Sequence, residues 1–253
     1  MPGLVEGKAA LVTGGASGIG RACALVLARE GARVMVSDLD AAEGEMTAAV
    51  IREAGGAAEF QHADVSSESD VVELVGAAVT RFGRLDCAVN NAGITGQGGA
   101  VQDLSLEDWN RTLSVNLTGV FLCMKHELPV MQRQGAGAIV NMASGAGVLA
   151  VPGLSPYCAS KHAVLGLTKT AAVENAKTGV RINAVCPGST DTPMLRQAMS
   201  VSPQLEKMIL SSMPGGRLGT PEEIAEAAVF LCSDRASFVT GESMLVDGGS
   251  VAR

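Results

Sequence analysis

Aromatic side chains are scarce in this chain of 253 residues, which holds one tyrosine, one tryptophan and five phenylalanines. Because 47% of the residues are nevertheless hydrophobic, a large core is expected, and Ala, Val, Leu, Ile and Met must form most of it. Buried parallel strands covered by helices have this composition. The composition alone therefore favours an α/β protein.

Positive charge is also in short supply, since the 19 basic residues are outnumbered by 26 acidic ones and the net charge is −7. No cluster of Lys and Arg forms the basic stripe that phosphate neutralisation needs, so we expect no nucleic-acid partner. The first residues lack a secretory signal, and the longest weakly polar stretch, residues 137–154, contains Asn141 and Pro152. We therefore expect a cytoplasmic protein with no membrane partner.

Metal-binding and disulfide patterns are missing as well. The cysteines show no CxxC spacing, and the three histidines show no paired spacing typical of metal ligands. We expect no metal, and we expect reduced, mostly buried thiols. The six cysteines are Cys23, Cys87, Cys123, Cys158, Cys186 and Cys232.

Apolar runs of strand length alternate with helical patterns along the whole chain. Parallel strands joined by helical crossovers form a doubly wound sheet with helices on both faces, and we expect a single Rossmann-like domain over residues 1–253. Seven strands are predicted at residues 8–13, 33–38, 57–61, 85–93, 137–144, 180–188 and 243–249. Helices are predicted at residues 19–31, 41–56, 68–83, 107–133, 156–177 and from 221 onward.

One long irregular segment is predicted at about residues 189–220. Segments longer than an ordinary loop are often functional, so we interpret this one as a substrate lid inserted into the domain. The helix after it has a clear start, because Thr220 can cap it, Pro221 fits the first turn and Glu223 can complete a capping box.

The glycine-rich turn TGGASGIG (residues 13–20) follows the first strand and opens a helix. Its glycines, Gly14, Gly18 and Gly20, do not have the G-x-G-x-x-G spacing, so by spacing alone they could merely shape a tight turn. The position of the turn is more informative, because amides at a helix N-terminus can bind a pyrophosphate. We therefore predict a dinucleotide site that includes Ser17 and Ile19.

Asp38 ends the second strand, eighteen residues after Gly20. An acid at about this spacing binds the adenosine ribose hydroxyls and repels a 2′-phosphate, which favours NAD over NADP. Leu39 belongs to the same expected site, whereas Arg21 and Arg33 lie near enough in sequence to weaken the preference. The alternative is that Asp38 only caps the next helix.

Tyr157, the single tyrosine, precedes Lys161 by four residues on a predicted helix, so the two side chains share one face. A free phenol titrates near 10 and is a poor acid or base at neutral pH. One ammonium about 4 Å away supplies roughly 4 kcal/mol in favour of phenolate at an effective dielectric near 20. We therefore expect Lys161 to lower the pKa of Tyr157.

Two further polar residues could join this pair. Ser144 ends a predicted strand, where side chains face the ligand crevice, and Asn116 lies in mid-helix, where Asn is a poor helix former. Each residue also has a structural explanation: a packed ring for Tyr157, a solvated side chain for Lys161, a cap for Ser144 and a buried hydrogen bond for Asn116. The combination after a dinucleotide turn favours catalysis.

These motifs together resemble the short-chain dehydrogenase/reductase family from end to end. The turn at residues 13–20 resembles the cofactor turn of the family, NNAG (90–93) the motif after its fourth strand, and Ser144 with YCASK (157–161) its catalytic motif. PGSTDTPM (187–194) and the terminal DGG match as well. Thr190 departs mildly from the pattern, because a branched aliphatic residue is usual there.

The resemblance implies a catalytic tetrad of Asn116, Ser144, Tyr157 and Lys161. Tyr157 would exchange the substrate proton while hydride passes to or from the nicotinamide, Lys161 would also bind the ribose, Ser144 would hold the substrate oxygen, and Asn116 would anchor a water relay. A homotetramer with strand order 3-2-1-4-5-6-7 is implied too. Further implied cofactor contacts are Asp64, Val65, Asn91, Ala92, Gly93, Pro187, Gly188, Thr190 and Thr192.

Apolar side chains indicate the substrate. The predicted lid contains Met194, Met199, Met208 and Met213, and flexible thioethers fit irregular apolar surfaces, although the same side chains could pack the lid or a subunit contact. We predict a small, largely apolar alicyclic or aliphatic secondary alcohol or its ketone. The expected apolar rim after Ser144 consists of Leu149, Val151 and Leu154.

Three functions fit the sequence. The leading one is an NAD-dependent alcohol dehydrogenase or ketone reductase. The second is an NADPH-dependent 3-oxoacyl-[acyl-carrier-protein] reductase, which would need a basic docking patch, and the third is a non-catalytic dinucleotide-sensing protein, which would not need the four catalytic side chains. The basic residues available for docking are scattered: Lys125, Arg133, Lys169 and Arg181.

Overall fold

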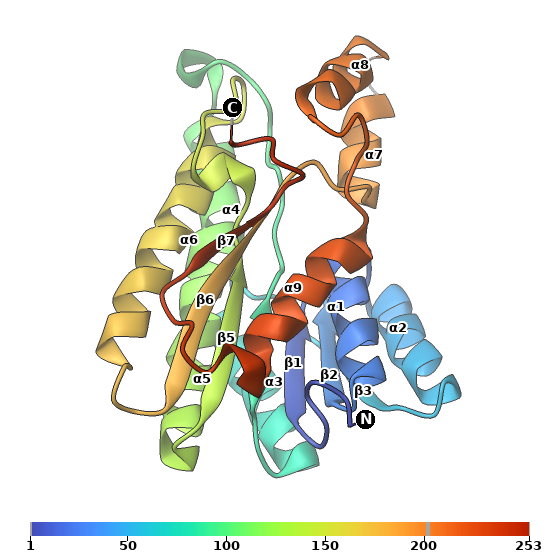
Figure 1. The fold of residues 1–253 in the computed structure, drawn as a ribbon. Helices are drawn as coiled ribbons and strands as arrows, with labels where there is room; N and C mark the ends of the chain where they lie inside the picture. The colour runs from blue at the N-terminus through green and yellow to red at the C-terminus, as the bar shows by residue number, and fades with distance from the viewer. Residues whose placement is uncertain (1, 201–202, 253) are drawn as a thin grey trace.

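Seven parallel strands form one sheet in the order β3-β2-β1-β4-β5-β6-β7 (Figure 1). The computed structural model describes residues 2–200 and 203–252. Its topology confirms the predicted fold class and strand order. The strands are β1 (Ala9–Thr13), β2 (Arg33–Asp38), β3 (Ala57–His62), β4 (Cys87–Asn90), β5 (Gly137–Met142), β6 (Val180–Pro187) and β7 (Ser243–Val246).

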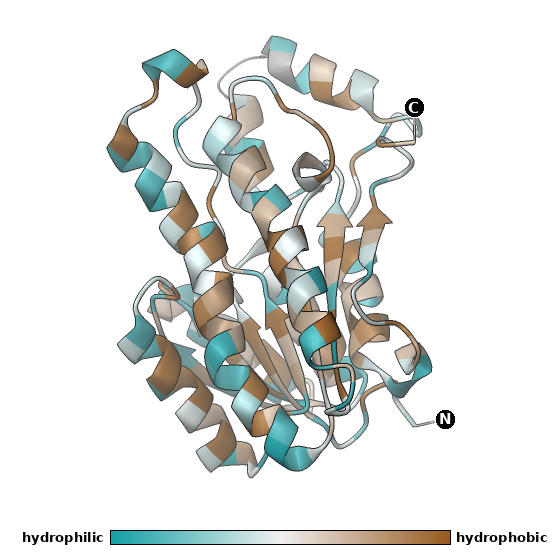
Figure 2. Ribbon diagram, turned by 90° about the vertical axis from the view of Figure 1, so that its left-hand side faces the viewer, coloured by the Kyte–Doolittle hydropathy of each residue, from teal (hydrophilic) through white to brown (hydrophobic). Residues whose placement is uncertain are grey.

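Helices cover both faces of this sheet and enclose two hydrophobic cores. Successive residues of a strand point to opposite faces, so Leu11 packs in one core and Val12 in the other. Figure 2 shows the strands as predominantly apolar and the helices as mixed. One core contains α3 (Glu68–Phe82), α5 (Gly119–Gln134) and α6 (Ser155–Glu174), and the other contains α1 (Gly18–Arg29), α2 (Ala41–Glu53) and α9 (Pro221–Cys232).

The helix predicted at residues 107–133 is not uniform. The structure divides it into α4 (Leu106–Leu113), a π-helical turn at Ser114–Thr118 and α5. Asn116 lies in the π turn and is fully buried. The long helix is therefore confirmed as a continuous helical segment over residues 106–134, and the π turn within it was not predicted, because the local sequence does not reveal where the backbone changes its hydrogen-bond register.

The segment at 189–220 is also more regular than predicted. It contains α7 (Pro193–Ser200) and α8 (Pro203–Ser212), which stand at the top of Figure 1 after the end of β6. Both helices begin with proline, whose fixed φ suits the first helical turn. The expectation of an irregular segment is therefore wrong. The capping box that starts α9 is confirmed, with Thr220 and Glu223 each bonding the backbone of the other.

All six cysteines are free, and every one except Cys158 is buried, which confirms the expected distribution of thiols. Within the described residues, no helix is both long and apolar enough to cross a membrane.

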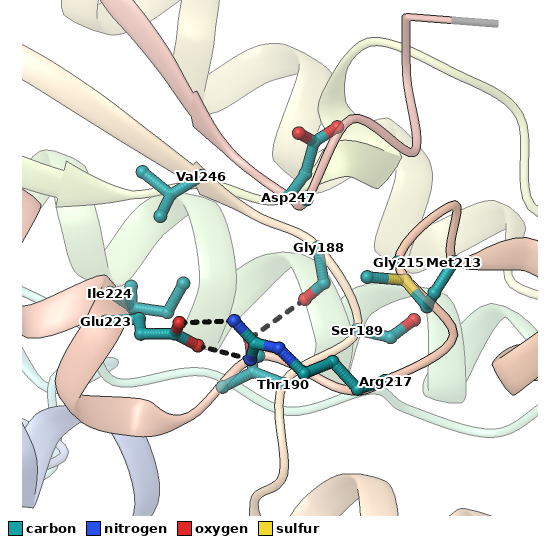
Figure 3. A pocket seen from close by; sticks show the side chains of 12 residues that line it. Gly188, Ser189, Thr190, Met213, Gly215, Arg217, Glu223, Ile224, Val246 and Asp247 are labelled. Atoms are coloured by element: carbon teal, nitrogen blue, oxygen red, sulfur yellow. Dashed lines mark hydrogen bonds and ion pairs between the residues drawn. The ribbon is translucent and has the colours of Figure 1, made fainter.

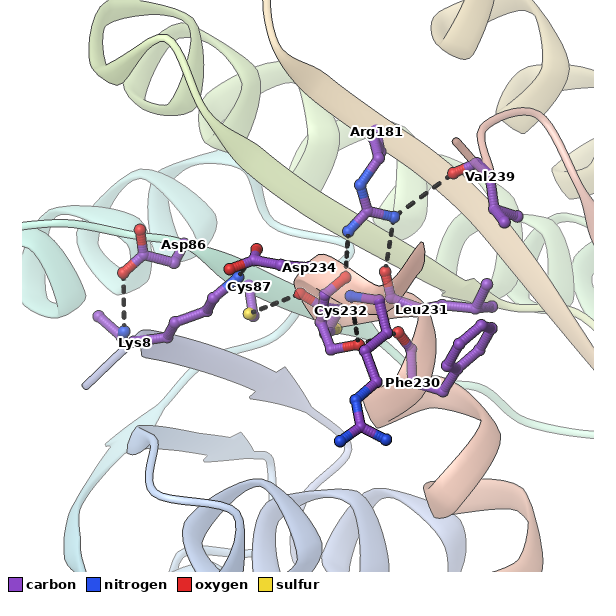
Figure 4. Close-up of polar contacts among 12 residues, drawn as sticks. Lys8, Asp86, Cys87, Arg181, Phe230, Leu231, Cys232, Asp234 and Val239 are labelled. Atoms are coloured by element: carbon purple, nitrogen blue, oxygen red, sulfur yellow. Dashed lines mark hydrogen bonds and ion pairs between the residues drawn. The ribbon is translucent and has the colours of Figure 1, made fainter. Parts of the chain in front are cut away.

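A partly buried arginine connects the amino end of β6 to the end of α9 (Figure 4). Arg181 of β6 donates hydrogen bonds to the carbonyl oxygens of Leu231 (2.8 Å) and Ser233 (3.0 Å). A cation suits the carbonyl-rich C-terminus of a helix. Asp86, just before β4, accepts from the backbone amide of Ala9 at 2.9 Å. The side chains at the amino ends of the strands thus make structural contacts.

We expect Arg181→Ala to lower the free energy of unfolding by about 1–3 kcal/mol, because helix-end carbonyls lose their donors in a partly buried place. Thermal unfolding followed by circular dichroism measures the change. Arg81→Ala is the matched control, since Arg81 pairs with Glu59 on the surface, where an ion pair contributes less than about 1 kcal/mol. Equal effects of the two substitutions would contradict a structural role for Arg181.

Candidate active site

The opposite edge of the sheet brings together the residues predicted to bind the cofactor and the substrate. Parallel strands end at one edge, so segments distant in sequence meet there. Gly14 follows β1, Asp38 ends β2, Asn91 follows β4, and Ser144 lies two residues beyond β5. Pro187 ends β6 and Gly188 follows it.

The glycine turn forms a cradle that side chains would fill. Gly14 and Gly18 have φ values of +66° and +52°, which glycine adopts readily. A Cβ added at Gly20 would overlap the carbonyl oxygen of Gly14 and the side-chain amide of Asn91. That amide donates to the carbonyl oxygens of Thr13 and Gly14, each at 3.1 Å. The Asn91 side chain therefore stabilises the turn. Ser17 and Ile19 lie at the start of α1, directly after it.

Asp38 is connected to this turn. Its carboxylate accepts from the amide of Ala16 at 2.9 Å and from the amide of Asp40 at 3.1 Å. The residue that caps α2 is Asp40, whose side chain accepts from the amides of Ala42 and Glu43. The interpretation of Asp38 as the helix cap is therefore wrong. Leu39 beside it is 59% exposed.

The two arginines near Asp38 in sequence are held by other partners. Arg33 lies at the amino end of β2, donates to the carbonyl oxygen of Phe82 at 3.1 Å and stacks 5.5 Å from the centroid of its ring. Arg21 pairs with Glu43 at 3.6 Å. Arg33 therefore lies at the end of β2 opposite to Asp38, and Arg21 has an acidic partner.

The remaining segments predicted to contact the cofactor surround the same edge. Asp64 follows β3 and accepts from the amide and hydroxyl of Ser66, at 2.8 and 2.7 Å. Val65 is buried against Gly119, where a Cβ would lie 2.8 Å from its methyl group. Thr192 lies next to Gly18, so the loop after β6 reaches the glycine turn. The fold thus joins the first and last parts of the expected site.

The side chains of Asn116 and Lys161 both lie close to Gly93. A Cβ at Gly93 would come within 3.2 Å of the Asn116 Oδ1 and 3.5 Å of the Lys161 Nζ. The Asn116 side chain accepts from the amide of Ile94 and donates to its carbonyl oxygen, both at 2.8 Å. Lys161 is 3% exposed, and its Nζ donates to the carbonyl oxygen of Met142 at 2.8 Å.

The electrostatics of Tyr157 and Lys161 differ from the expectation. The Lys161 Nζ lies 5.6 Å from the centroid of the Tyr157 ring, and burial lowers the pKa of Lys161 to about 8. Burial raises the pKa of Tyr157, and an interaction with the Ser144 side chain opposes that effect. The expectation that Lys161 lowers the pKa of Tyr157 is wrong for this structure, because desolvation of the phenolate dominates.

Ser144 also has a structural role. Its hydroxyl accepts from the amide of Ala146 at 3.1 Å and caps the short 3₁₀ turn Gly145–Gly147. Capping leaves the hydroxyl hydrogen available to a second oxygen. The cap and the interaction with Tyr157 are therefore compatible.

Sequence reasoning missed Ser160. This side chain is fully buried, accepts from the Asn116 Nδ2 at 3.2 Å and donates to the carbonyl oxygen of Tyr157 at 2.7 Å. Its spacing of three residues from Tyr157 puts it on a neighbouring part of the helix surface, which is the signal that could have identified it. Ser160 connects the π turn to the helix that carries Tyr157 and Lys161.

A pocket of about 180 Å³ lies behind the loop that follows β6 (Figure 3). Arg217 and Glu223, which both line it, pair through two hydrogen bonds, at 2.9 and 2.7 Å. Gly219 bonds to both Ser189 and Asp191 through its backbone. These contacts attach the loop containing Gly188 and Thr190 to the start of α9, and the pocket contains none of the predicted catalytic side chains.

No group of three His, Cys, Asp or Glu side chains is suitably placed for a metal ion anywhere in residues 2–200 or 203–252.

Comparison with known proteins identifies the family. A family model described as enoyl-(acyl carrier protein) reductase matches residues 14–251. The chain belongs to the short-chain dehydrogenase/reductase family. It is 45% identical over 249 residues to 2,5-dichloro-2,5-cyclohexadiene-1,4-diol dehydrogenase of Sphingobium indicum, with 98% of each chain covered.

Two further relatives agree with this assignment. Cyclohexanol dehydrogenase of Acinetobacter sp. is 43% identical over 246 residues, covering 97% of this chain and 96% of the relative. The crystal structure of levodione reductase matches with a TM-score of 0.94 and 38% identity, covering 98% of each chain. The protein is therefore an oxidoreductase of a family whose dehydrogenases use nicotinamide cofactors.

The glycine cradle predicts the effect of a single methyl group. Gly20→Ala is expected to abolish NADH binding measured by fluorescence titration, because the new Cβ would overlap the backbone of the turn. Gly76→Ala is the control, since a Cβ at this exposed position of α3 meets nothing within 4 Å and alanine favours helix. Unchanged NADH affinity in Gly20→Ala would contradict the placement of the cofactor on this turn.

Proposed function

We propose that this protein is an NAD-dependent dehydrogenase that interconverts a small, largely apolar secondary alcohol, in particular an alicyclic one, with its ketone. The observation that carries the proposal is a chain of contacts at the carboxyl ends of the strands: Asn116 and Lys161 lie beside Gly93, the Tyr157 ring lies 5.6 Å from the Lys161 Nζ, and Tyr157 interacts with the Ser144 side chain. A protein that only sensed a dinucleotide would have no use for a buried ammonium beside a phenol.

The preference for NAD rests on Asp38 and its surroundings. Its carboxylate is fixed by two backbone amides at the end of β2, where it would accept from ribose hydroxyls and repel a 2′-phosphate. Arg33 is directed to the other edge of the sheet, and Arg21 is paired with Glu43. Neither of these two arginines is therefore available to bind the 2′-phosphate of NADP. The nicotinamide ring of this cofactor accepts or donates the hydride when it is bound.

Tyr157, Ser144 and Lys161 would handle the proton and the substrate oxygen. In alcohol oxidation the proton of the substrate hydroxyl passes to the Tyr157 oxygen, and in ketone reduction the phenol returns it. Ser144 would donate a hydrogen bond to the substrate oxygen. Lys161, with a pKa of about 8, is mostly charged at neutral pH and would bind the hydroxyls of the nicotinamide ribose. Asn116 holds the backbone of Ile94 beside these groups.

The substrate class is inferred from the rim of the site and from the relatives. Val148 and Leu149, just after the Ser144 turn, expose 42% and 36% of their surface, and Met194 of α7 exposes 41%. An apolar ring would cover such side chains. The relatives from Sphingobium and Acinetobacter are named for cyclohexadienediol and cyclohexanol. We assign the α7–α8 segment as the substrate lid, although Met213, which follows α8, is buried.

The acyl-carrier-protein alternative loses support from the structure. Arg181, one of its four candidate docking residues, is occupied with carbonyl groups at the amino edge of the sheet. Lys125 is paired with Glu68. Two scattered basic residues remain, Arg133 and Lys169, which do not make a docking patch for an acidic carrier protein.

Tyr157→Phe is expected to reduce cyclohexanol oxidation by at least about a thousandfold, because the proton acceptor is removed. NADH affinity should stay within about twofold, which separates catalysis from binding.

With the unmodified enzyme, kcat/KM should be more than about tenfold higher for NAD than for NADP, because Asp38 repels the extra phosphate. Residual turnover in Tyr157→Phe near the original rate would overturn the catalytic role, and NADP preference would overturn the role of Asp38.

A further inference from the structure

Four buried polar side chains connect the middle of the sheet to the helices on one face. They are Asn90 at the end of β4, Asn141 in β5, Glu127 in α5 and Thr168 in α6. Asn90 is 2% exposed and the other three are fully buried. Buried polar groups are unfavourable unless they are hydrogen-bonded, so such a chain needs an explanation.

The hydrogen bonds run outward from the two asparagines. The Asn90 Nδ2 donates to the Glu127 Oε2 and to the Asn141 Oδ1, both at 3.1 Å. The Asn141 Nδ2 donates to the Thr168 hydroxyl at 2.9 Å and to the Met124 sulfur at 3.2 Å. Both N–H groups of each amide are thus used, and each strand is linked to its neighbour and to a helix.

Through Thr168, this chain provides α6 with a second attachment to β5. The first is the bond from the Lys161 Nζ to the carbonyl oxygen of Met142, the residue next to Asn141. Lys161 and Thr168 are seven residues apart, so they lie two turns apart on the same face of the helix. Two anchors on one face fix the tilt of α6 against β5, and with it the position of Tyr157 relative to Ser144.

The state of Glu127 follows from the same contacts. Its Oε1 and the Asn90 Oδ1 are buried acceptors without a donor, so the network lacks hydrogens and not acceptors. Among the described residues no cation forms an ion pair with Glu127, and β4, β5 and α6 contribute only amides and a hydroxyl to its network. The titratable neighbour on its own helix is Cys123, whose pKa the carboxylate raises in addition to burial. A neutral carboxyl suits this place better than a charged one.

We propose that Thr168 and a neutral Glu127 are positioning residues, which hold the catalytic helix α6 in place through Asn141 and Asn90. The kinetic part of this proposal rests on the proposed dehydrogenase function. Neither residue touches the substrate or the cofactor, and each acts through the placement of Tyr157.

Thr168→Val tests the anchor, because valine has the shape of threonine but cannot accept from Asn141. We expect kcat for cyclohexanol oxidation to fall by about tenfold, within the roughly hundredfold loss that a 1 Å misplacement can cause, while KM for NAD stays within about twofold. Thr168→Ser, which keeps the hydroxyl, should have the kcat of the unmodified protein. Thr170→Val is the matched control, since Thr170 lies on the same helix, is exposed, and donates its hydroxyl hydrogen to the carbonyl oxygen of Gly166.

Hydrogen exchange supplies a readout that needs no substrate. In Thr168→Val, amides of residues 155–161 should exchange at least about threefold faster, while those of α3 keep their rate, because the opening is local. Thr170→Val should change neither. If exchange responds as expected but neither the unmodified protein nor any variant oxidises cyclohexanol, the proposed function is wrong and the anchoring role of Thr168 is supported. If Thr168→Val behaves like Thr170→Val in both measurements, the positioning role is wrong, and faster exchange throughout the protein would show a merely structural one.

Glu127→Gln tests the neutral carboxyl, because glutamine keeps the shape and an acceptor oxygen but is uncharged at every pH. Burial raises the pKa of Glu127 from 4.5 to about 7 in the folded protein. The stabilisation from the neutral form is therefore complete below about pH 4.5 and is lost as the pH rises through about 7. The melting temperature of the unmodified protein should fall across this range, and that of Glu127→Gln should fall less.

The control for this measurement is Glu73→Gln, at an exposed position of α3. It should leave the pH dependence of the melting temperature as in the unmodified protein. At pH 6, Glu127→Gln should also keep kcat within about twofold, since a neutral side chain already occupies that place. The same pH dependence in Glu127→Gln and in the unmodified protein would overturn the neutral state of Glu127.

Discussion

The hydrogen bond between the buried ammonium of Lys161 and the carbonyl oxygen of Met142 is the contact on which the rest of the site depends. It places a cation beside the end of β5, two residues before Ser144, and it fixes the helix that carries Tyr157 one turn earlier. Because burial lowers the pKa of Lys161 to about 8, the charge is retained at neutral pH but is poorly solvated. A small shift of α6 against β5 would separate the cation, the phenol and the hydroxyl together. The placement of buried amides and a hydroxyl at this helix–strand contact is therefore physically reasonable.

The amino and carboxyl ends of the parallel strands carry different kinds of residues. At the amino ends of the strands, Arg181 and Asp86 hydrogen-bond to backbone groups. At the carboxyl ends of the strands, a Cβ at Gly14 or Gly20 would collide with neighbouring atoms of the turn, and a Cβ at Gly93 would crowd Asn116. Within the proposed function, the absence of side chains there would let a planar or phosphate-bearing ligand approach the backbone amides. The stability of the sheet and the accessibility of the site are thus assigned to opposite ends of the same strands.

Burial acts on the two ionisable partners in opposite directions. It makes Tyr157 harder to ionise and Lys161 easier to neutralise, so at neutral pH the phenol is neutral while the ammonium, with a pKa of about 8, is mostly charged. Within the proposed function, a positive charge on an oxidised nicotinamide nearby would favour phenolate again. The acid–base readiness of the site would then depend on the cofactor, which is consistent with a phenol that remains neutral until oxidation begins.

The sequence by itself determined the α/β class, the number of strands and their approximate bounds, and the start of α9 at Thr220, because these follow from local periodicity and capping. It also indicated that Tyr157 and Lys161 share a helix face and that Asp38 ends a strand. Only the tertiary structure decided that residues 114–118 form a π turn, that residues 193–212 contain two helices and that Arg33 points to the far edge. It also reversed the expected direction of the Tyr157 pKa and revealed the network from Glu127 to Thr168. These features depend on desolvation and on contacts between residues that are far apart in the chain, and neither can be read from a local pattern.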